Sequence, residues 1–429
     1  MKRVLILVLA ALMVFGLAAC SPGKRQKDEE VFVPALDQTT ECKIRIVGNY
    51  SNFEALEAEF DRFNVYYPNV ELSYTKIDNY NDSIATVLGG NDAPNVFFSF
   101  SWMIGNSAYD EVFAHMENLA DPALGLRLDC IRPGLLNRAS DGRVLTVPIF
   151  STSYGMLIND DLFAKKGLSV PTTLQELLSV CAAFREKGCA SPMMGYSAKS
   201  SNSLMNTLAY PIFAGTLAAH PEMVAPANQC DPAAGEYMRP ALETLLRLID
   251  ADCIDLTECA AIEDNYEKVI LRFFKGDVPM MICTGDTVSG TKKRESQSKE
   301  FSENPFAYSF APIPTTDKGG YFLDSPSVQF SVNNSCANLD MTNEFMRFLI
   351  MKTELNQMAA VKRLITPSKD LSFDQVYAPI GKVAPELVVS PSALGIEDTL
   401  AVQIRLAAFK VGTKELTVDE AVAQYGALK

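Results

Sequence analysis

Polar and aromatic residues follow two apolar-rich runs of this chain, where they could contact a bound small molecule. Asn49 and Tyr50 follow the first run, and Ser101 and Trp102 follow the second. Trp102 is the only tryptophan, and its flat apolar ring with one polar edge is suited to stacking on a sugar. A lone tryptophan also commonly covers the end of a hydrophobic core, so the sequence leaves both roles open.

Asp286 stands after a third apolar-rich run, which ends at Gly285. A carboxylate in this position can accept hydrogen bonds from hydroxyl groups or pair with a cation. It could equally cap the N-terminus of a helix. Asp286 is therefore a candidate ligand contact with a structural alternative.

The common catalytic motifs do not occur in the sequence. His115 and His220 are the only histidines, and there is no HExxH, no GxSxG and no P-loop. A carboxylate pair for glycoside hydrolysis is recognised by its separation in space, so the sequence does not exclude one. We predict that the protein is not an enzyme and keep a secreted hydrolase as an alternative.

Charge and cysteine content limit the partners of the chain. Its formal charge is −14, and Lys2 and Arg3 contribute +2, so the part after residue 20 carries −16. Such a charge argues against nucleic acid and anionic lipid surfaces as partners. Nine cysteines follow Cys20 and none forms CxxC, so we expect no metal and no cofactor. Nine is odd, so at least one is unpaired, and free thiols throughout would suit an anaerobic habitat.

The first twenty residues are typical of a secretory leader. Lys2 and Arg3 precede an apolar run, Val4 to Ala19, that is short for a membrane span. The run ends in Leu-Ala-Ala-Cys, which resembles a bacterial lipobox. We predict a lipoprotein signal peptide over 1–20, lipidation of Cys20 and a flexible tether over 21–41. An ordinary signal peptide is the alternative.

Strands and helices are predicted to alternate from Cys42 onward. Strands over 43–48, 70–74 and 94–98 are separated by two helices, the first with a capping box at Ser51 and Glu54. Short connections between such elements give parallel pairing, hence an α/β lobe. Ligands of open α/β sheets bind beyond the carboxyl ends of the strands, which is where the candidates above stand.

Residues 141–188 continue the alternation with clear boundaries. Strands are predicted over 143–148 and 154–158, and Asn159 opens a short helix that Gly167 ends. A capping box at Thr173 and Glu176 then begins a helix that stops at Gly188.

This stretch resembles the central signature of family 1 extracellular solute-binding proteins, the maltodextrin-binding type, which are lipoprotein receptor subunits of bacterial ABC importers. The matching residues are Gly142, Val147-Pro148, Tyr154-Gly155, Asn159, Asp161-Leu162-Phe163, Gly167, Pro171, Thr173 and Glu176-Leu177. Residues 273–285, 311–320 and 364–369 resemble later family segments. The family often has tryptophan shortly after the position of Gly285. Asp286 and Thr287 stand there instead, which makes a long maltodextrin-like ligand less expected.

The resemblance implies a two-lobed periplasmic-binding-protein-like (type II) α/β fold. Each lobe is expected to hold a mostly parallel sheet flanked by helices, with a cleft and a hinge between the lobes. The predicted lobes are 42–152 plus 318–366 and 153–317 plus 367–429. The chain is expected to cross between them near 151–154, 312–320 and 364–370.

The resemblance also extends the set of candidate ligand contacts. It places Ser153 and Tyr154 at the first crossing, and Asp324 and Ser325 where family members hold small residues near the ligand. The stretch around Tyr210 reaches the cleft in some family members, and a core role is as well supported.

The implied function is substrate capture for an ABC importer, by hinge closure on a small solute, most readily a mono- or oligosaccharide. The implied partners are membrane permease subunits. The protein is then a monomer, extracytoplasmic and held to the membrane only by its lipid anchor. The alternatives are a polyamine or organic anion as ligand, or a lipid-anchored sensory or adhesive module.

Overall fold

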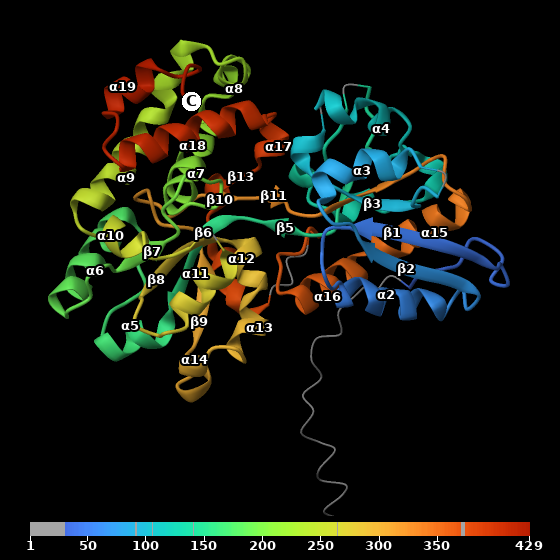
Figure 1. The fold of residues 1–429 in the computed structure, drawn as a ribbon, viewed down its shortest axis with the longest axis horizontal. Helices are drawn as coiled ribbons and strands as arrows, with labels where there is room; N and C mark the ends of the chain where they lie inside the picture. Colours follow the sequence, from blue (N-terminus) through green and yellow to red (C-terminus); the bar gives the residue numbers. More distant parts are fainter. Residues whose placement is uncertain (1–30, 91, 105, 140, 264, 370–373) are drawn as a thin grey trace, which may run out of the picture. The chain divides into compact units, whose positions relative to one another are not determined.

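Two main β-sheets organise the protein, with helices packed around each (Figure 1). The computed structural model describes residues 31–429 except 91, 105, 140, 264 and 370–373. Residues Pro34–Lys429 form one compact unit. The predicted signal peptide and Cys20 lie outside the described residues. None of the described helices is long and apolar enough to cross a membrane.

The first sheet has the strand order β2-β1-β3-β12-β4. β1 pairs in parallel with β2 and β3, whereas β12 is antiparallel to β3 and β4. The strands are β1 (Cys42–Gly48), β2 (Val70–Lys76), β3 (Val96–Ser99), β4 (Val147–Pro148) and β12 (Gln329–Val332). The three strands predicted first are thus confirmed, but the strand predicted over 143–148 is reduced to two residues.

The second sheet has the order β7-β8-β6-β9. β7 is parallel to β8, and β6 is antiparallel to both β8 and β9. The strands are β6 (Tyr154–Asn159), β7 (Met193–Gly195), β8 (Met280–Thr284) and β9 (Tyr308–Ala311). The two-lobed α/β class is confirmed, but both sheets are mixed rather than mostly parallel. β12 and β6 each begin directly after a segment that connects the two sheets. They therefore run in the opposite direction to the strands that lead towards these connecting segments.

Helices cover both sheets (Figure 1). We call each sheet with its helices a lobe. The first lobe has α2 (Glu54–Asn64), α3 (Tyr80–Leu88), α4 (Asp110–Ala114), α15 (Leu339–Leu349) and α16 (Lys352–Lys362). The second has α5 (Asp160–Lys166), α6 (Leu174–Glu186), α7 (Leu204–Ala219), α8 (Val224–Asn228), α9 (Arg239–Asp250), α10 (Leu256–Cys259), α11 (Tyr266–Phe273), α12 (Gly285–Ser289), α13 (Thr291–Glu295), α14 (Lys299–Glu303), α17 (Pro391–Leu394), α18 (Asp398–Gly412) and α19 (Val418–Ala423).

Most predicted helix boundaries follow from local capping chemistry. The side chains of Asn159 and Thr173 accept backbone N–H bonds at the starts of α5 and α6, and Gly167 ends α5 with a positive φ of 67°. The capping box predicted at Ser51 is wrong, because α2 begins at Glu54 with Phe53 as its N-cap and no side-chain cap. Phe53 is fully buried, so packing of its ring fixes the start of the helix.

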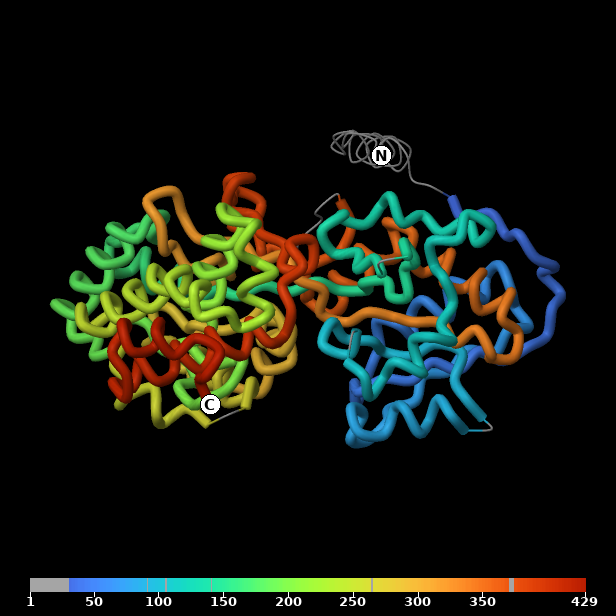
Figure 2. The backbone as a smooth tube through the Cα atoms, turned by 90° about the horizontal axis from the view of Figure 1, so that it is seen from above, coloured from blue at the N-terminus to red at the C-terminus, as the bar shows by residue number. Residues whose placement is uncertain are grey.

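Three extended segments connect the lobes and lie side by side. β5 (Ser151–Thr152) pairs antiparallel with β11 (Ser325–Pro326), and the N–H of Ser151 donates to the carbonyl of Ile365 at 2.9 Å. Figure 2 shows these distant parts of the chain meeting between the two sheets. We call these segments the hinge.

The second hinge segment lies later in the chain than the predicted 312–320. β10 (Phe322–Leu323) pairs with β13 (Val388–Val389), and Phe322 and Leu323 belong to the hydrophobic cluster of the second lobe. The sequence had assigned these two residues to the first lobe. The full division of the chain into lobes stays a prediction.

The cysteines are dispersed through both lobes. Within the described residues all nine are free, and Cys181, Cys253, Cys259 and Cys283 are buried. These four pack in the core of the second lobe as small apolar residues.

Candidate functional site

A pocket of about 770 Å³ lies at the hinge and is lined from both lobes. Its size is within the usual range for small-molecule sites. The first lobe contributes Ser101, Trp102, Ile104, Asn106, Asn137 and Arg138, and the hinge contributes Ser325. The second lobe contributes Tyr154, Tyr210, Pro391, Ser392, Gly395, Ile396, Glu397, Asp398, Thr399 and Ala401. Four predicted contacts, Ser101, Trp102, Tyr154 and Ser325, therefore meet in one cavity.

Trp102 is placed in the pocket by the turn that follows β3. Its ring lies parallel to Phe100, with centroids 6.1 Å apart, and is steeply inclined at 77° to the ring of Tyr109, with centroids 5.7 Å apart. These neighbours hold the ring while leaving the residue only half-buried. A fixed, partly open aromatic face is what stacking on a sugar ring requires.

Tyr154 and Tyr210 form an aromatic corner on the opposite lobe. Their rings meet edge to face with centroids 5.4 Å apart. Burial raises the pKa of Tyr154 to about 12, with the negative charge of Asp286 as the next cause, so its hydroxyl is neutral and can donate. Tyr210, for which the sequence left a core role open, lines the pocket from α7.

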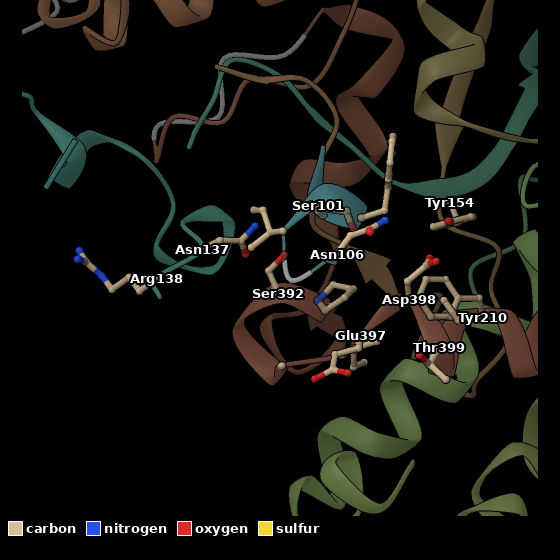
Figure 3. Close-up of a pocket in the computed structure, with 17 residues that line it drawn as sticks. Ser101, Asn106, Asn137, Arg138, Tyr154, Tyr210, Ser392, Glu397, Asp398 and Thr399 are labelled. Atoms are coloured by element: carbon tan, nitrogen blue, oxygen red, sulfur yellow. The ribbon is translucent and has the colours of Figure 1, made fainter. Parts of the chain in front are cut away.

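Among the charged residues that line the pocket, Asp398 is the one beside this aromatic corner. Figure 3 shows it beside Tyr154 and Tyr210, whereas Arg138 and Glu397 point away from them. Asp398 is the first residue of α18, and its charge contributes to raising the pKa of both tyrosines. The pocket thus offers an anionic acceptor, neutral hydroxyls and amides, which suits hydroxyl-rich ligands.

Tyr50 and Asn49 are placed differently from the pocket-lining candidates. Tyr50 packs edge to face on Phe53 and Phe98 at 5.2 and 5.3 Å, and its backbone N–H donates to the hydroxyl of Tyr74. Asn49 is exposed, and neither residue lines the pocket. Ser153 is buried, with its hydroxyl donating to the carbonyl of Tyr154 at 3.4 Å.

Asp286 lies in α12, beyond the end of β8, as the sequence suggested. It is not the N-cap, which is Thr284. Its exposed carboxylate accepts a hydrogen bond of 2.6 Å from the hydroxyl of Ser327. The surrounding protein raises the pKa of Asp286 by desolvation, while the hydrogen bond from Ser327 lowers it. Asp286 joins the second lobe to the chain just after β11 and lies outside the pocket lining.

Asp324 is occupied by a structural partner. It is 4% exposed, and its carboxylate accepts two bonds from Arg132, at 2.6 and 2.7 Å. Arg132 also donates to the hydroxyl of Ser151 at 2.7 Å and to the carbonyls of Thr366 and Ser368 at 2.5 and 2.9 Å. One guanidinium therefore ties all three hinge segments together, and Asp324 serves the hinge.

Sequence reasoning missed Ile104, Asn106 and Ala401 and two further groups of pocket residues. Asn137 and Arg138 stand before the Asp141-Gly142 turn, and residues 391–399 follow the third hinge segment. The only local signal was the helix start at Asp398, which carries no information about the neighbouring lobe. Within the described chain, no group of three or more His, Cys, Asp or Glu is placed to hold a metal ion.

Two α/β lobes joined by three adjacent segments, with an aromatic and polar pocket at the junction, define a solute-binding protein. The family comparison agrees with this class. Residues 48–352 match the model of the bacterial extracellular solute-binding proteins, and the chain belongs to that family. Its members are extracellular binding proteins.

Solved structures share the fold at low sequence identity. Apo RafE from Streptococcus pneumoniae matches with a TM-score of 0.66 and 17% identity, over 92% of this chain and 100% of that one. The GacH receptor of Streptomyces glaucescens matches with a TM-score of 0.64 and 19% identity, over 90% and 97%. A chitin oligosaccharide binding protein matches with a TM-score of 0.66 and 16% identity, over 90% and 98%. No match was found among curated protein sequences.

Proposed function

We propose that this protein is the lipid-anchored substrate-binding subunit of an ABC importer, and that it captures a saccharide in the pocket at the hinge. The observation that carries the proposal is that one pocket is lined by Trp102 from one lobe and by Tyr154 and Tyr210 from the other. Closure of the lobes would bring aromatic faces against both sides of a sugar ring. Serine, asparagine and Asp398 side chains between them accept and donate hydrogen bonds to hydroxyl groups.

Related structures support a saccharide as the ligand class. RafE has been solved with raffinose, and the GacH receptor with acarbose. In the present chain the charged pocket residue beside the aromatic corner is the acid Asp398 (Figure 3). An organic anion fits this corner poorly, and a polyamine is the second candidate ligand because a carboxylate beside aromatic rings also suits a cation.

A thermal-shift screen with saccharides, sugar acids and polyamines tests the proposal. We expect the largest rise in melting temperature with a neutral saccharide. The Trp102→Ala variant should lose that rise, because the stacking face is gone, while the ligand-free melting temperature changes little. The half-buried position of Trp102 is the reason for the second expectation.

Tyr266→Ala is the matched control, since Tyr266 is a 52% exposed aromatic outside the pocket lining. This variant should keep the full ligand shift. An undiminished shift in Trp102→Ala would remove Trp102 from the site, and a response to polyamines alone would replace the saccharide proposal.

The membrane attachment is a separate part of the proposal. Cys20→Ala should release the protein from membranes into the medium in cells that process lipoproteins, because Cys20 would carry the lipid. Retention of the Cys20→Ala protein on membranes would contradict the anchor while leaving the binding function intact.

A further inference from the structure

Residues 390–398 form a connection that touches both lobes beside the pocket, and we call it the strap. It contains α17 and leads from β13 into α18. Pro391, Ser392, Gly395, Ile396, Glu397 and Asp398 of the strap line the pocket. Figure 1 shows α17 at the junction of the two lobes.

Leu394 and Ile396 of the strap pack against the hydrophobic cluster of the second lobe, and one polar side chain of that lobe binds the strap backbone. The amide nitrogen of Asn228, at the end of α8, donates to the carbonyl of Gly395 at 2.7 Å. The amide oxygen of Asn228 accepts from the N–H of Glu397 at 3.0 Å. Gly395 adopts a positive φ of 73°, which turns the chain between α17 and α18. Asn228 thus satisfies backbone groups on both sides of this turn.

The other face of the strap contacts the first lobe. The hydroxyl of Ser390 donates to the carbonyl of Gly134, in the short helical turn Pro133–Leu135. A Cβ atom on Gly134 would lie 2.7 Å from Cβ of Ser390, so the approach depends on a glycine. Asn137, three residues after Gly134, lines the pocket beside Ser392 (Figure 3).

We propose that the strap closes one end of the pocket, so that the site holds a saccharide by its terminal residue rather than by an internal part of a long chain. This inference rests on the proposed function. Hydrogen bonds run from Asn228 through the strap to Gly134, so the strap bridges the two lobes along the wall of the pocket that it lines. Asp398, at the end of the strap, would accept hydrogen bonds from hydroxyls of the terminal sugar.

End-modified saccharides test the closed end. Maltotriose and chitotriose are each compared with a reducing-end 4-nitrophenyl glycoside and with a non-reducing-end benzylidene acetal by titration calorimetry. We expect one modification of the bound trisaccharide to weaken binding at least 100-fold, because the added group would meet the strap. Asn228→Ala and Gly134→Ala each loosen the strap from one lobe. In both variants the affinity for the excluded derivative should rise at least tenfold.

Gly89→Ala is the control for Gly134→Ala. Gly89 has a φ of −80°, and its added Cβ would meet only ordinary contacts at 3.6 Å, so binding should be unchanged. If both derivatives bind as tightly as the parent trisaccharide, the pocket has no closed end. The same holds if neither Asn228→Ala nor Gly134→Ala restores the binding of either derivative. If neither trisaccharide nor any other saccharide of the thermal-shift screen binds, the proposed function is wrong, and this inference is then wrong as well.

Discussion

Two buried glutamates of the first lobe share one arginine. Glu59 on α2 and Glu354 on α16 are 2% and 4% exposed, and the guanidinium of Arg62 contacts both carboxylates. Burial raises the pKa of Glu59 well above its ordinary value, and the neighbouring Glu354 raises it further. One arginine cannot compensate two buried negative charges, so we infer that Glu59 holds a proton near neutral pH.

The proton on Glu59 makes the free energy of unfolding depend on pH. Since the folded state binds it more tightly than the unfolded state, the free energy of unfolding should fall as the pH rises above 4.5, the ordinary value for the group. Glu59→Gln mimics the protonated form. We expect it to flatten this slope and to stabilise the protein at pH 8 by about 1 kcal/mol or more, measured by urea unfolding at pH 5 and pH 8.

Glu57→Gln provides the comparison, because Glu57 is exposed on the same helix. Its effect should be small at both pH values. A Glu59→Gln protein that is less stable than wild type at pH 8 would show that Glu59 is ionised there.

At the scale of elements, the hinge is held by charged groups as well as by backbone pairing. Arg132 joins the three hinge segments through Asp324, Ser151, Thr366 and Ser368. A second tie runs from Arg363, which ends α16 and donates to Glu295 and to the hydroxyl of Tyr308, both at 2.7 Å. These bonds fix the segments relative to one another, so motion between the lobes should be confined to rotation about them.

Arg132→Met removes the charge of the hinge arginine while keeping much of its apolar stem. Asp324 is then buried without a partner, and we expect the free energy of unfolding to fall by about 3–5 kcal/mol in urea titrations. Arg143→Met is the control, since Arg143 pairs with Asp141 in a half-exposed bond of 2.7 Å, and it should cost less than about 1 kcal/mol.

Asp324→Asn combined with Arg132→Met should recover part of the loss, because the orphaned charge is gone. If Arg132→Met proves no more destabilising than Arg143→Met, the hinge does not depend on this guanidinium. A ligand role for Asp324 would instead appear as weakened binding in Asp324→Asn with unchanged stability.

At the scale of the whole molecule, binding should shift the protein towards a closed form. The pocket residues come from two lobes, so one ligand can contact all of them fully only when the lobes approach. We expect saturating saccharide to lower the radius of gyration in X-ray scattering. At 100 times the dissociation constant it should stabilise the protein by about 2.7 kcal/mol.

The same saccharide added to Trp102→Ala should leave the radius of gyration unchanged, since the ligand no longer binds. A wild-type protein that is saturated, by calorimetry, without any compaction would contradict closure. It would then bind its ligand in a preformed cavity.

The sequence by itself determined the elements and their class, because these depend on local chemistry. The continuous apolar run of β6, the caps at Asn159 and Thr173 and the turn at Gly167 act within a few residues, and each is found where it was expected. The alternating run over 143–148 gave only the two-residue strand β4. The strand-end rule likewise placed Ser101 and Trp102, which follow β3, in the pocket, whereas Asn49 and Tyr50, chosen by the same rule, do not line it. Tyr154 was expected from the family resemblance.

Only the tertiary structure decided which polar groups are left free for a ligand. Asp324 and Asp398 are both acids near the hinge, but Arg132 occupies the first, whereas the second faces the aromatic corner. The partners lie 192 residues apart in one case and come from different elements in the other. Local sequence does not predict such pairings, because they form only when the two lobes pack around the hinge.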